Sequence, residues 1–544
     1  MLILRRLVLL AAVTAAAARP APAQRNRGAA PAATAPPVAV LTQQIIEAPI
    51  RFLADDLLEG RAPGTRGGDI AARYLVSQFA GLGLKPAAPD GSFYQWVSLA
   101  GLTSDVSLVV GARGATLVLE PGSDVVAWPE RADSVTTLDA DLVFAGYGIS
   151  APAWQWDDYK GNAQTGKIVV VLPSEPLDLD SAAFRGRALT EYGLWQAKLD
   201  QAARMGAVGV LLVHSPSDVP LNWEAVRNTW SGEHLLLDRP PTQSLRFAAW
   251  ISAEAARRIV EVTGKDYAAL LRRAESPDFQ PINLGARAAV DLHSRVRRFR
   301  APNVIARLDG ADSIGRGEAV VVTAHYDHLG RGRPEGVDSI CNGAVDDASG
   351  VGVVLAVAAA LARAPAPPRR SVVWLVTTAA EAGGLGAATY VTQPAFPLNR
   401  TVAVLGVDRG NVWGPTKDVV SLGSELSSLG DWVGEAARAE SLSVAPDPNP
   451  QQGDLYRSDL LAFVRGRVPV GLLQPGPTYT DREPNWGREQ WRAYLSDRYH
   501  RPGDGVRPDF DYRGLVQQAR VLTRLVWSLA ESARVPLAAP GGTL

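Results

Sequence analysis

The C-terminal half of the chain alternates between short valine-rich runs and longer apolar segments. The runs at 319–325 (AVVVTAH), 371–379 (SVVWLVTTA) and 401–408 (TVAVLGVD) have the length and composition of strands buried on both faces. The segments at 349–364 and 514–533 have the length of helices, and the first is apolar nearly all round. This alternation predicts an α/β fold with a mainly parallel central sheet and helices on both faces.

The N-terminal part of the mature chain is predicted to contain a core-facing helix within 50–86. Four apolar side chains share one helical face, and Gly83 stands at the position of a C-cap. The four are Ile70, Tyr74, Leu75 and Phe79.

Between about 105 and 295 the pattern changes to strands and turns. GKIVVVL (166–172) and GVLLVH (209–214) are strand-like, and an amphipathic helix is expected between them. This βαβ unit predicts a second, smaller domain of mixed, β-rich structure. We expect His214 to be an ordinary histidine at a strand end, because no catalytic constellation accompanies it.

The first residues have the features of a secretory signal peptide. Arg5 and Arg6 precede a short apolar stretch, and Ala21-Pro22-Ala23 is a small-x-small cleavage site. The alternative is a retained single-span anchor, although the stretch is shorter than the roughly 20 residues that span a bilayer. We expect an exported protein, periplasmic or extracellular, with no stable membrane association.

Length, charge and cysteine content narrow the classes of function. A chain of 544 residues is expected to form two or more domains. The formal net charge of −1 gives no sign of a surface for nucleic acid or anionic membrane. Cys341 is the single cysteine, so zinc sites built from several cysteines are excluded.

Candidate chemistry gathers where the predicted strands end. Three strands of the C-terminal domain end in His325, Glu381 and Asp408, while Asp346 and His500 lie in polar loops. Functional groups in open α/β sheets collect beyond the carboxyl ends of the strands. Imidazole and carboxylate ligands suit zinc, with manganese or cobalt as alternatives.

Five ligands exceed the needs of one catalytic zinc and suit two metals that share a carboxylate. Asp327, two residues after His325, is expected to orient that imidazole through its second nitrogen. Each residue alone has a simpler explanation, such as a surface histidine or a capping carboxylate. Their convergence on one edge of one sheet favours a metal site.

Several motifs resemble a known family. TAHYDHLG (323–330), NGAVDDASGVG (342–352), VDRGNVWG (407–414), YHRPGD (499–504) and the stretch around Glu381 resemble the zinc exopeptidases that include bacterial leucyl aminopeptidases and glutamate carboxypeptidase. The middle of the chain resembles the protease-associated (PA) domain often inserted in that family. The resemblance implies a zinc exopeptidase (phosphorylase/hydrolase-like) fold and the following division. The segments are a signal peptide (1–23), a flexible leader (24–45), an N-terminal part of the peptidase domain (46–105), an inserted PA-like domain (106–295), the main part of the peptidase domain (296–535) and a tail (536–544).

The resemblance also implies roles for the five candidate ligands. His325, Asp346 and Asp408 would bind one zinc ion, and Asp346, Glu381 and His500 the other. The family has a cis peptide bond after the bridging aspartate, here between Asp346 and Asp347. The implied substrates are the N-termini of peptides or proteins, and the oligomeric state is not implied.

One departure from the family concerns catalysis directly. The family pattern is Thr-Ala-Glu-Glu-x-Gly-Leu-Leu-Gly, in which the first Glu is the general base and the second a ligand. Aligned without gaps, Glu381 keeps the ligand position and the base becomes Ala380. A register shifted by one residue makes Glu381 the base and Ala382 the missing ligand, which leaves a site suited to one ion. The ungapped register is preferred because it keeps Gly383, Leu385 and Gly386 in place.

Two interpretations of function follow. The first is an exported zinc aminopeptidase whose activity is impaired by Ala380, because a general base contributes typically about 10²–10⁴-fold. Glu335 and Asp347 are nearby carboxylates that could replace the base. The alternative is an inactive pseudo-peptidase that keeps the metal site for binding or structure. A second departure is Leu460, where relatives usually carry His after Ser-Asp.

Overall fold

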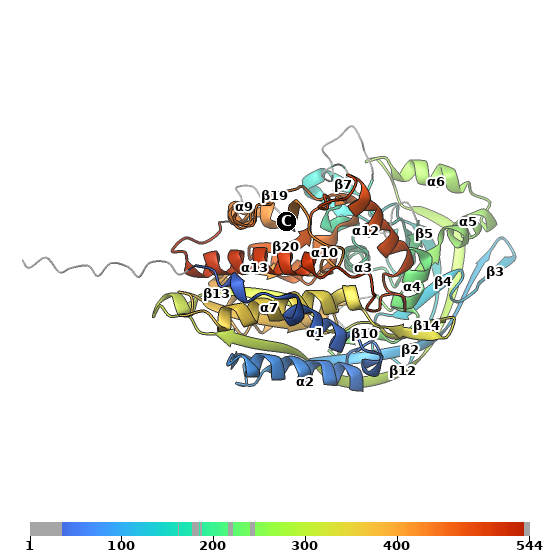
Figure 1. Ribbon diagram of the computed structural model, residues 1–544. Helices are drawn as coiled ribbons and strands as arrows, with labels where there is room; N and C mark the ends of the chain where they lie inside the picture. The colour runs from blue at the N-terminus through green and yellow to red at the C-terminus, as the bar shows by residue number, and fades with distance from the viewer. Residues whose placement is uncertain are drawn as a thin grey trace, which may run out of the picture. The chain divides into compact units, whose positions relative to one another are not determined.

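In the computed structural model, the valine-rich runs of the C-terminal half are the strands at the centre of one large sheet (Figure 1). The structure describes residues 35–161, 163–176, 184, 186, 188–215, 221–239 and 245–537. The predicted signal peptide and the first half of the predicted leader (24–34) lie outside these residues. The helices are α1 (Gln43–Leu53), α2 (Arg66–Gly81), α3 (Trp195–Arg204), α4 (Trp223–Trp230), α5 (Ala253–Val262), α6 (Tyr267–Ala274), α7 (Ser349–Ala362), α8 (Leu385–Thr392), α9 (Leu429–Ala439), α10 (Asp454–Arg457), α11 (Leu460–Arg465), α12 (Trp486–Asp497) and α13 (Arg513–Glu531).

The sheet path has the order β19-β18-β20-β17-β13-β16-β12-β5-β8-β9-β11-β4. Its strands β13, β16, β17 and β20 pair in parallel, as do β5, β8, β9 and β11, while β12 pairs antiparallel to both groups. The strands are β1 (Lys85–Pro86), β2 (Tyr94–Ala112), β3 (Ala115–Leu119), β4 (Val125–Pro129), β5 (Val135–Phe144), β6 (Ser150–Ala151), β7 (Trp156–Asp157), β8 (Ile168–Val171), β9 (Gly209–His214), β10 (His234–Leu237), β11 (Phe247–Ser252), β12 (Ile282–Leu308), β13 (Ala319–His325), β14 (Gly330–Glu335), β15 (Asp338–Cys341), β16 (Ser371–Thr377), β17 (Thr401–Gly406), β18 (Asp418–Leu422), β19 (Ser443–Val444) and β20 (Val470–Pro475).

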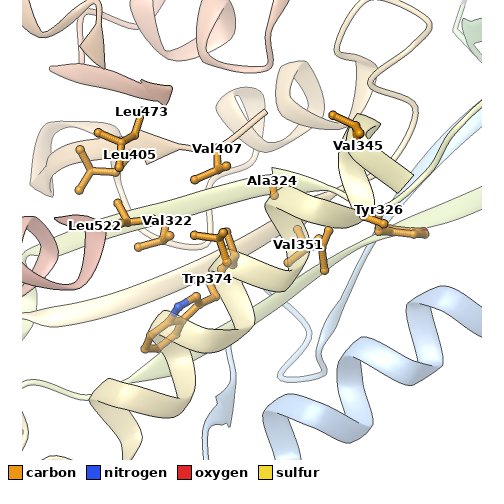
Figure 2. Packing of buried hydrophobic residues seen from close by; sticks show 14 of the residues in the cluster. Val322, Ala324, Tyr326, Val345, Val351, Trp374, Leu405, Val407, Leu473 and Leu522 are labelled. Atoms are coloured by element: carbon orange, nitrogen blue, oxygen red, sulfur yellow. The ribbon is translucent and has the colours of Figure 1, made fainter. Parts of the chain in front are cut away.

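Both faces of the central strands are buried, as the continuous apolar runs predict. Alternate residues of β13 point to opposite sides, so Val322 belongs to one core cluster and Val321 to another. Helices α1, α2, α7, α9 and α13 contribute to the first cluster, and α8 and α11 to the second. Figure 2 shows Val322, Trp374 and Leu405 of the first cluster side by side on three neighbouring strands. The predicted α/β architecture with helices on both faces is confirmed.

Helix α7 is the centre of the first layer of helices. It packs against both α1 and α13, and thirteen of its fourteen residues are buried (Figure 1). The segment Ala344–Ala362 is long and apolar enough to cross a membrane, but all of it lies inside the fold. Its composition therefore reflects a core helix, and each fully buried Val or Leu side chain contributes about 1.5–3 kcal/mol of hydrophobic stabilisation.

The predicted N-terminal helix is confirmed as α2. Thr65 caps its start by accepting a hydrogen bond from the Gly68 N–H (3.2 Å), and Gly83 follows its end with a left-handed φ of 75°. An additional helix, α1, begins at Gln43, so the last residues of the predicted leader are helical. Ile46 and Ile50 of α1 are buried, which explains why this polar-looking stretch is ordered by packing.

The middle of the chain has a hydrophobic core of its own. The cluster runs from Leu108 to Leu292 in sequence and packs under α5 and α6. Strand β8, helix α3 and strand β9 form the predicted βαβ unit, and His214 is buried with its Nε2 on the Leu221 carbonyl (2.8 Å). The long strands β2 and β12 pair with each other, and β12 continues into the central strands of the large sheet through β16. Pro36–Leu544 is therefore one compact unit, and the domain boundaries stay predictions.

Candidate metal centre

The five predicted ligands lie at or next to the ends of five different helices and strands. His325 is the last residue of β13, and Asp346 lies in the turn before α7. Glu381 lies in the turn between β16 and α8, Asp408 just after β17, and His500 after α12. The parallel pairing of β13 with β16 and β17 brings three of these positions to the same edge.

Four of the five side chains meet around the Asp346 carboxylate. Its Oδ1 lies 3.2 Å from Nε2 of His325, and its Oδ2 lies 3.4 Å from Nε2 of His500. The same His500 nitrogen is 3.0 Å from Oε2 of Glu381. Ligand atoms of His325, Asp346 and Glu381 all lie within 4.8 Å of one another. Asp346 thus faces one imidazole with each oxygen, as a bridging carboxylate would.

Asp408 stands beside this group and pairs with its neighbour in sequence. Nε of Arg409 lies 3.2 Å from the Asp408 carboxylate, and the same guanidinium reaches Asp454 at 3.4 Å. Burial raises the pKa of Asp408 to about 6, an effect that Arg409 partly offsets and Asp346 strengthens. The fifth predicted ligand is therefore within electrostatic reach of Asp346.

Burial and mutual charge shift the protonation of the whole group. Burial alone would raise the pKa of Asp346, but hydrogen bonds from His325 and His500 hold it well below its usual range. Burial would lower the pKa of His500, but Glu381 and Asp346 raise it to about 9. The buried carboxylates thus require cationic partners.

The tautomer of His325 is set by Asp327, though not through its carboxylate. Nδ1 of His325 lies 3.1 Å from the main-chain oxygen of Asp327, while the nearest carboxylate oxygen is 3.8 Å away. A carbonyl only accepts, so Nδ1 carries a proton, and Nε2, which faces Asp346, is the nitrogen that would bind a metal. The contact to the second nitrogen is made by the Asp327 carbonyl, while the Asp327 side chain turns toward the N–H of Ala380 (3.4 Å).

Asp347 ties the segments around Asp346 together. The peptide bond between Asp346 and Asp347 is cis, as the resemblance implies. The Asp347 carboxylate accepts hydrogen bonds from the N–H groups of His325 (3.3 Å), Gly350 (2.9 Å) and Arg409 (3.0 Å). With its oxygens bound to the backbone, Asp347 is a structural residue and a poor candidate for the missing base.

Two further groups, which the sequence patterns did not single out, hold the Asp346 turn from outside. Asp504 accepts from the N–H groups of Val345 and Asp346, both at 3.1 Å. The wholly buried guanidinium of Arg61 donates to main-chain carbonyls, including those of Tyr326 (2.6 Å) and Gly343 (2.7 Å). Since Arg61 lies in the left-handed region (φ 41°) of a turn far away in sequence, no local pattern marks it.

His328 is a site residue that the sequence patterns did not single out. Its Nδ1 lies 2.7 Å from Oε1 of Glu381, and the ring is buried. The signal was present in TAHYDHLG, where a third titratable side chain follows His325 and Asp327. Each Glu381 oxygen therefore has its own imidazole partner, His328 on one side and His500 on the other.

The turn that carries Glu381 agrees with the ungapped register. Gly383 and Gly384 have left-handed φ values of 90° and 70°, and a Cβ at Gly386 would come within 2.3 Å of the Thr378 carbonyl. Of these glycines, Gly383 and Gly386 stand where the family pattern has glycine, and Glu381 lies among the predicted ligands. Ala380 is partly exposed and offers only a methyl group.

The other two residues named from the sequence lie away from the imidazoles. Glu335 accepts a hydrogen bond from Nε of Arg501 (2.6 Å), so its carboxylate is committed to an ion pair. Leu460 is buried in the second core cluster and packs against Gly406, where a Cβ would be 3.2 Å from Leu460 Cδ1. The side chain of Leu460 is thus packed in the apolar core, out of contact with water.

A cavity of about 580 Å³ opens beside the metal centre. It lies between α4, the segment 329–334 and the Glu381 turn. Apolar groups line one part of it, and the carboxylates of Asp327 and Glu381 line another. The apolar lining residues include Trp195, Trp230 and Leu329.

The donor set fits a divalent cation. His500 Nε2 is buried without a hydrogen-bond partner of good geometry, and it faces carboxylates of Asp346 and Glu381. Imidazole nitrogens and carboxylate oxygens in one buried group are the ligands that zinc prefers. His325, Asp346 and Glu381 thus form a candidate metal site.

Comparisons with known proteins agree with this architecture. Residues 303–526 match the model for peptidase family M28. The fold resembles an aminopeptidase from Aneurinibacillus sp. strain AM-1, with 19% identity, a TM-score of 0.55 and coverage of 92% of this chain and 97% of that chain. A zinc aminopeptidase from Bacillus subtilis is 17% identical, with a TM-score of 0.48 and coverage of 91% and 97%. No curated protein matches the chain significantly.

Proposed function

We propose that the chain is a metallopeptidase related to peptidase family M28, whose model matches residues 303–526, and that it acts as an aminopeptidase-type exopeptidase with two zinc ions. The observation that carries this proposal is the Asp346 carboxylate, whose two oxygens face the Nε2 atoms of His325 and His500. A bridging carboxylate between two imidazoles is the arrangement of many two-metal hydrolytic sites.

The ligand assignment follows from these contacts. One ion would be held by His325, Asp346 and Asp408. The other would be held by Asp346, Glu381 and His500. Bound there, zinc would supply Lewis acidity that activates a water and polarises the scissile carbonyl.

Neighbouring residues orient two of the predicted ligands. The Asp327 carbonyl and the His328 imidazole orient His325 and Glu381. The adjoining cavity, with its indole rings, suits the side chains of a peptide. We propose peptide N-termini as substrates.

Ala380 lowers the rate of peptide hydrolysis that we expect. At the position of the family's general base, a methyl group accepts no proton, and neither Asp347 nor Glu335 is free to replace it. Because a positioned base contributes typically about 10²–10⁴-fold, we propose a slow enzyme.

The second candidate is a pseudo-peptidase, and Ala380 is the observation that favours it. In this case the metal centre would be kept for stability or ligand binding without turnover. Both candidates bind metal, so metal content does not separate them. Peptide turnover does.

Export is part of the proposal. The sequence features at Arg5, Arg6 and Ala21-Pro22-Ala23 support a cleaved signal peptide. Cell fractionation followed by N-terminal sequencing tests it: a mature chain that begins near Gln24 outside the cytoplasm supports export, and an uncleaved cytoplasmic chain contradicts it.

The test of the function uses zinc-loaded mature protein, a panel of aminoacyl-p-nitroanilides and short peptides. Release of the first residue, blocked by N-acetylation and abolished in Asp346→Asn, supports an aminopeptidase. Cleavage of the acetylated peptides from the other end would show a carboxypeptidase. Equal rates in Asp346→Asn would show that the metal centre is not responsible.

A further inference from the structure

We infer that helix α4, which lies within the predicted inserted domain, positions the metal ligand His500 through Thr229 and Asn228. The inference rests on the proposed metal centre and adds two positioning residues to it. Thr229 and Asn228 lie 271 and 272 positions before His500 in the sequence.

The hydroxyl of Thr229 determines which nitrogen of His500 carries a proton. Its oxygen lies 2.7 Å from the main-chain oxygen of Ala225 and 2.6 Å from Nδ1 of His500. A hydroxyl has one proton, and a carbonyl can only accept, so that proton goes to Ala225. Thr229 must then accept from Nδ1–H of His500, which leaves Nε2 free for a metal ion.

Asn228 holds the backbone of the same ligand. Its Nδ2 donates to the main-chain oxygen of His500 (3.0 Å), and the side chain is buried. His500 has a left-handed φ of 60°, a conformation that a non-glycine residue adopts only when its surroundings hold it there. The contact from Asn228 is one of the restraints that hold it.

The helix itself is fixed against the same segment. Asn222 caps α4 by accepting from the N–H of Ala225 (2.8 Å), and its Nδ2 donates to the Ser496 carbonyl (2.7 Å). Helix α4 therefore contacts the chain from Ser496 to His500 at its start and near its end. This double attachment sets the distance between Thr229 and His500.

The two imidazoles of the centre are thus oriented by different parts of the molecule. His325 donates to Asp327, two residues away on its own segment, whereas His500 donates to the inserted domain. Loss of the α4 contact should weaken the ion held by His500 and spare the ion held by His325. Partners that orient a metal-bound histidine typically contribute about 10- to 100-fold in metal affinity.

The experiment measures zinc binding to the full mature chain by competition with a chromophoric chelator. Thr229→Val keeps the shape of the side chain but removes the acceptor, and Thr229→Ser keeps the hydroxyl. Thr263→Val is the matched control, since its hydroxyl bonds only within its own helix end, to Val260. We expect about 10- to 100-fold weaker binding of one ion in Thr229→Val, and affinities within about threefold of the natural chain in the other two.

A second measurement tests the tautomer without peptide turnover. The chain has six histidines, so ¹⁵N-histidine labelling gives few side-chain signals to assign. At saturating zinc, His500 of the natural chain should show a hydrogen-bonded Nδ1–H, and Thr229→Val should lose that hydrogen-bonded signal. Unchanged signals and zinc affinities in Thr229→Val would overturn the inference, as would equal weakening of both ions. Zinc binding without peptide turnover would instead contradict only the proposed function.

Discussion

Nδ1 of His328 lies 2.7 Å from Oε1 of Glu381, closer than His325 or His500 lies to a carboxylate of the candidate centre. A carboxylate can only accept, so Nδ1 of His328 donates, and the other Glu381 oxygen is left toward His500. The pair therefore sets the direction in which Glu381 presents its free oxygen.

We expect His328→Phe to weaken zinc binding about 10-fold, because Glu381 loses the donor that orients it. His328→Asn, whose amide can place a donor near the Nδ1 position, should bind within about threefold of the natural chain. Chelator competition measures both. Equal affinities in all three proteins would show that the contact is not needed for binding.

Gly343 is expected to be irreplaceable. Its φ is 58°, and an added Cβ would lie 2.2 Å from the Asp346 carbonyl and 2.6 Å from Cγ of His328. Gly343→Ala should lower both the melting temperature and the zinc affinity. Gly317→Ala, where nothing lies near the added methyl group, is the control and should change stability by less than about 0.5 kcal/mol.

Metal removal should destabilise the fold. Asp346 is buried and the partly buried Glu381 lies close to it, and without a cation only imidazolium groups balance their charge. Zinc at 100 times its dissociation constant should add about 2.7 kcal/mol to the free energy of unfolding. Thermal unfolding at several free zinc concentrations measures this effect. A melting temperature that does not change with zinc concentration would argue against a resident ion.

Leu460→His, which restores the residue usual in relatives, should destabilise the protein. Leu460 is buried against Gly406, so an imidazole there would lose apolar packing and hydration. We expect a loss of about 2–5 kcal/mol in the free energy of unfolding. Leu461→His, at a partly exposed neighbour, should cost clearly less in the same denaturant titration. An unchanged free energy of unfolding in Leu460→His would mean that the side chains around position 460 rearrange to accommodate the imidazole.

His234 predicts a pH dependence of stability. Burial lowers its pKa from 6.5 to about 3, and its ring lies 5.5 Å from that of Trp128. Between these pKa values the unfolded chain binds a proton that the folded chain does not, so stability falls as the pH falls below 6.5. The loss from this one group is about 2 kcal/mol between pH 6.5 and 5.

The check compares unfolding free energies at the two pH values in the natural chain and in His234→Phe, which keeps an aromatic ring without the titration. The variant should lose about 2 kcal/mol less on acidification. His293→Phe, at an exposed position, should behave like the natural chain. Identical pH profiles for the natural chain and His234→Phe would contradict the assignment.

The elements that pack most deeply were the ones most predictable from the sequence. Strands at 319–325 and 209–214 begin and end at the expected residues, because continuous apolar runs are bounded by polar ones. Helix α1 was not predicted to start at Gln43, since its order comes from contact with α7. Local propensity carries no information about that contact.

The candidate site divides in the same way. The five predicted ligands lie at one edge of the sheet, where strand ends and polar loops mark them along the chain. Arg61, Thr229 and Asp504 were not predictable, because each acts through main-chain atoms or a single hydrogen bond from a distant segment. Asp327 was predicted to orient His325. The sequence could not tell which Asp327 atom does so, and only the backbone geometry reveals that its carbonyl makes the contact.

The most direct test of the central claim is the rate of N-terminal residue release by the zinc-loaded natural chain beside Ala380→Glu and Ala380→Gln. The account predicts slow, zinc-dependent release by the natural chain, a kcat about 10²–10⁴-fold higher in Ala380→Glu, and no gain in Ala380→Gln, which has similar size but no base. A natural chain as fast as Ala380→Glu would show that another group already serves as the base. A natural chain with no turnover at all, beside an active Ala380→Glu, would contradict the slow enzyme and establish the pseudo-peptidase.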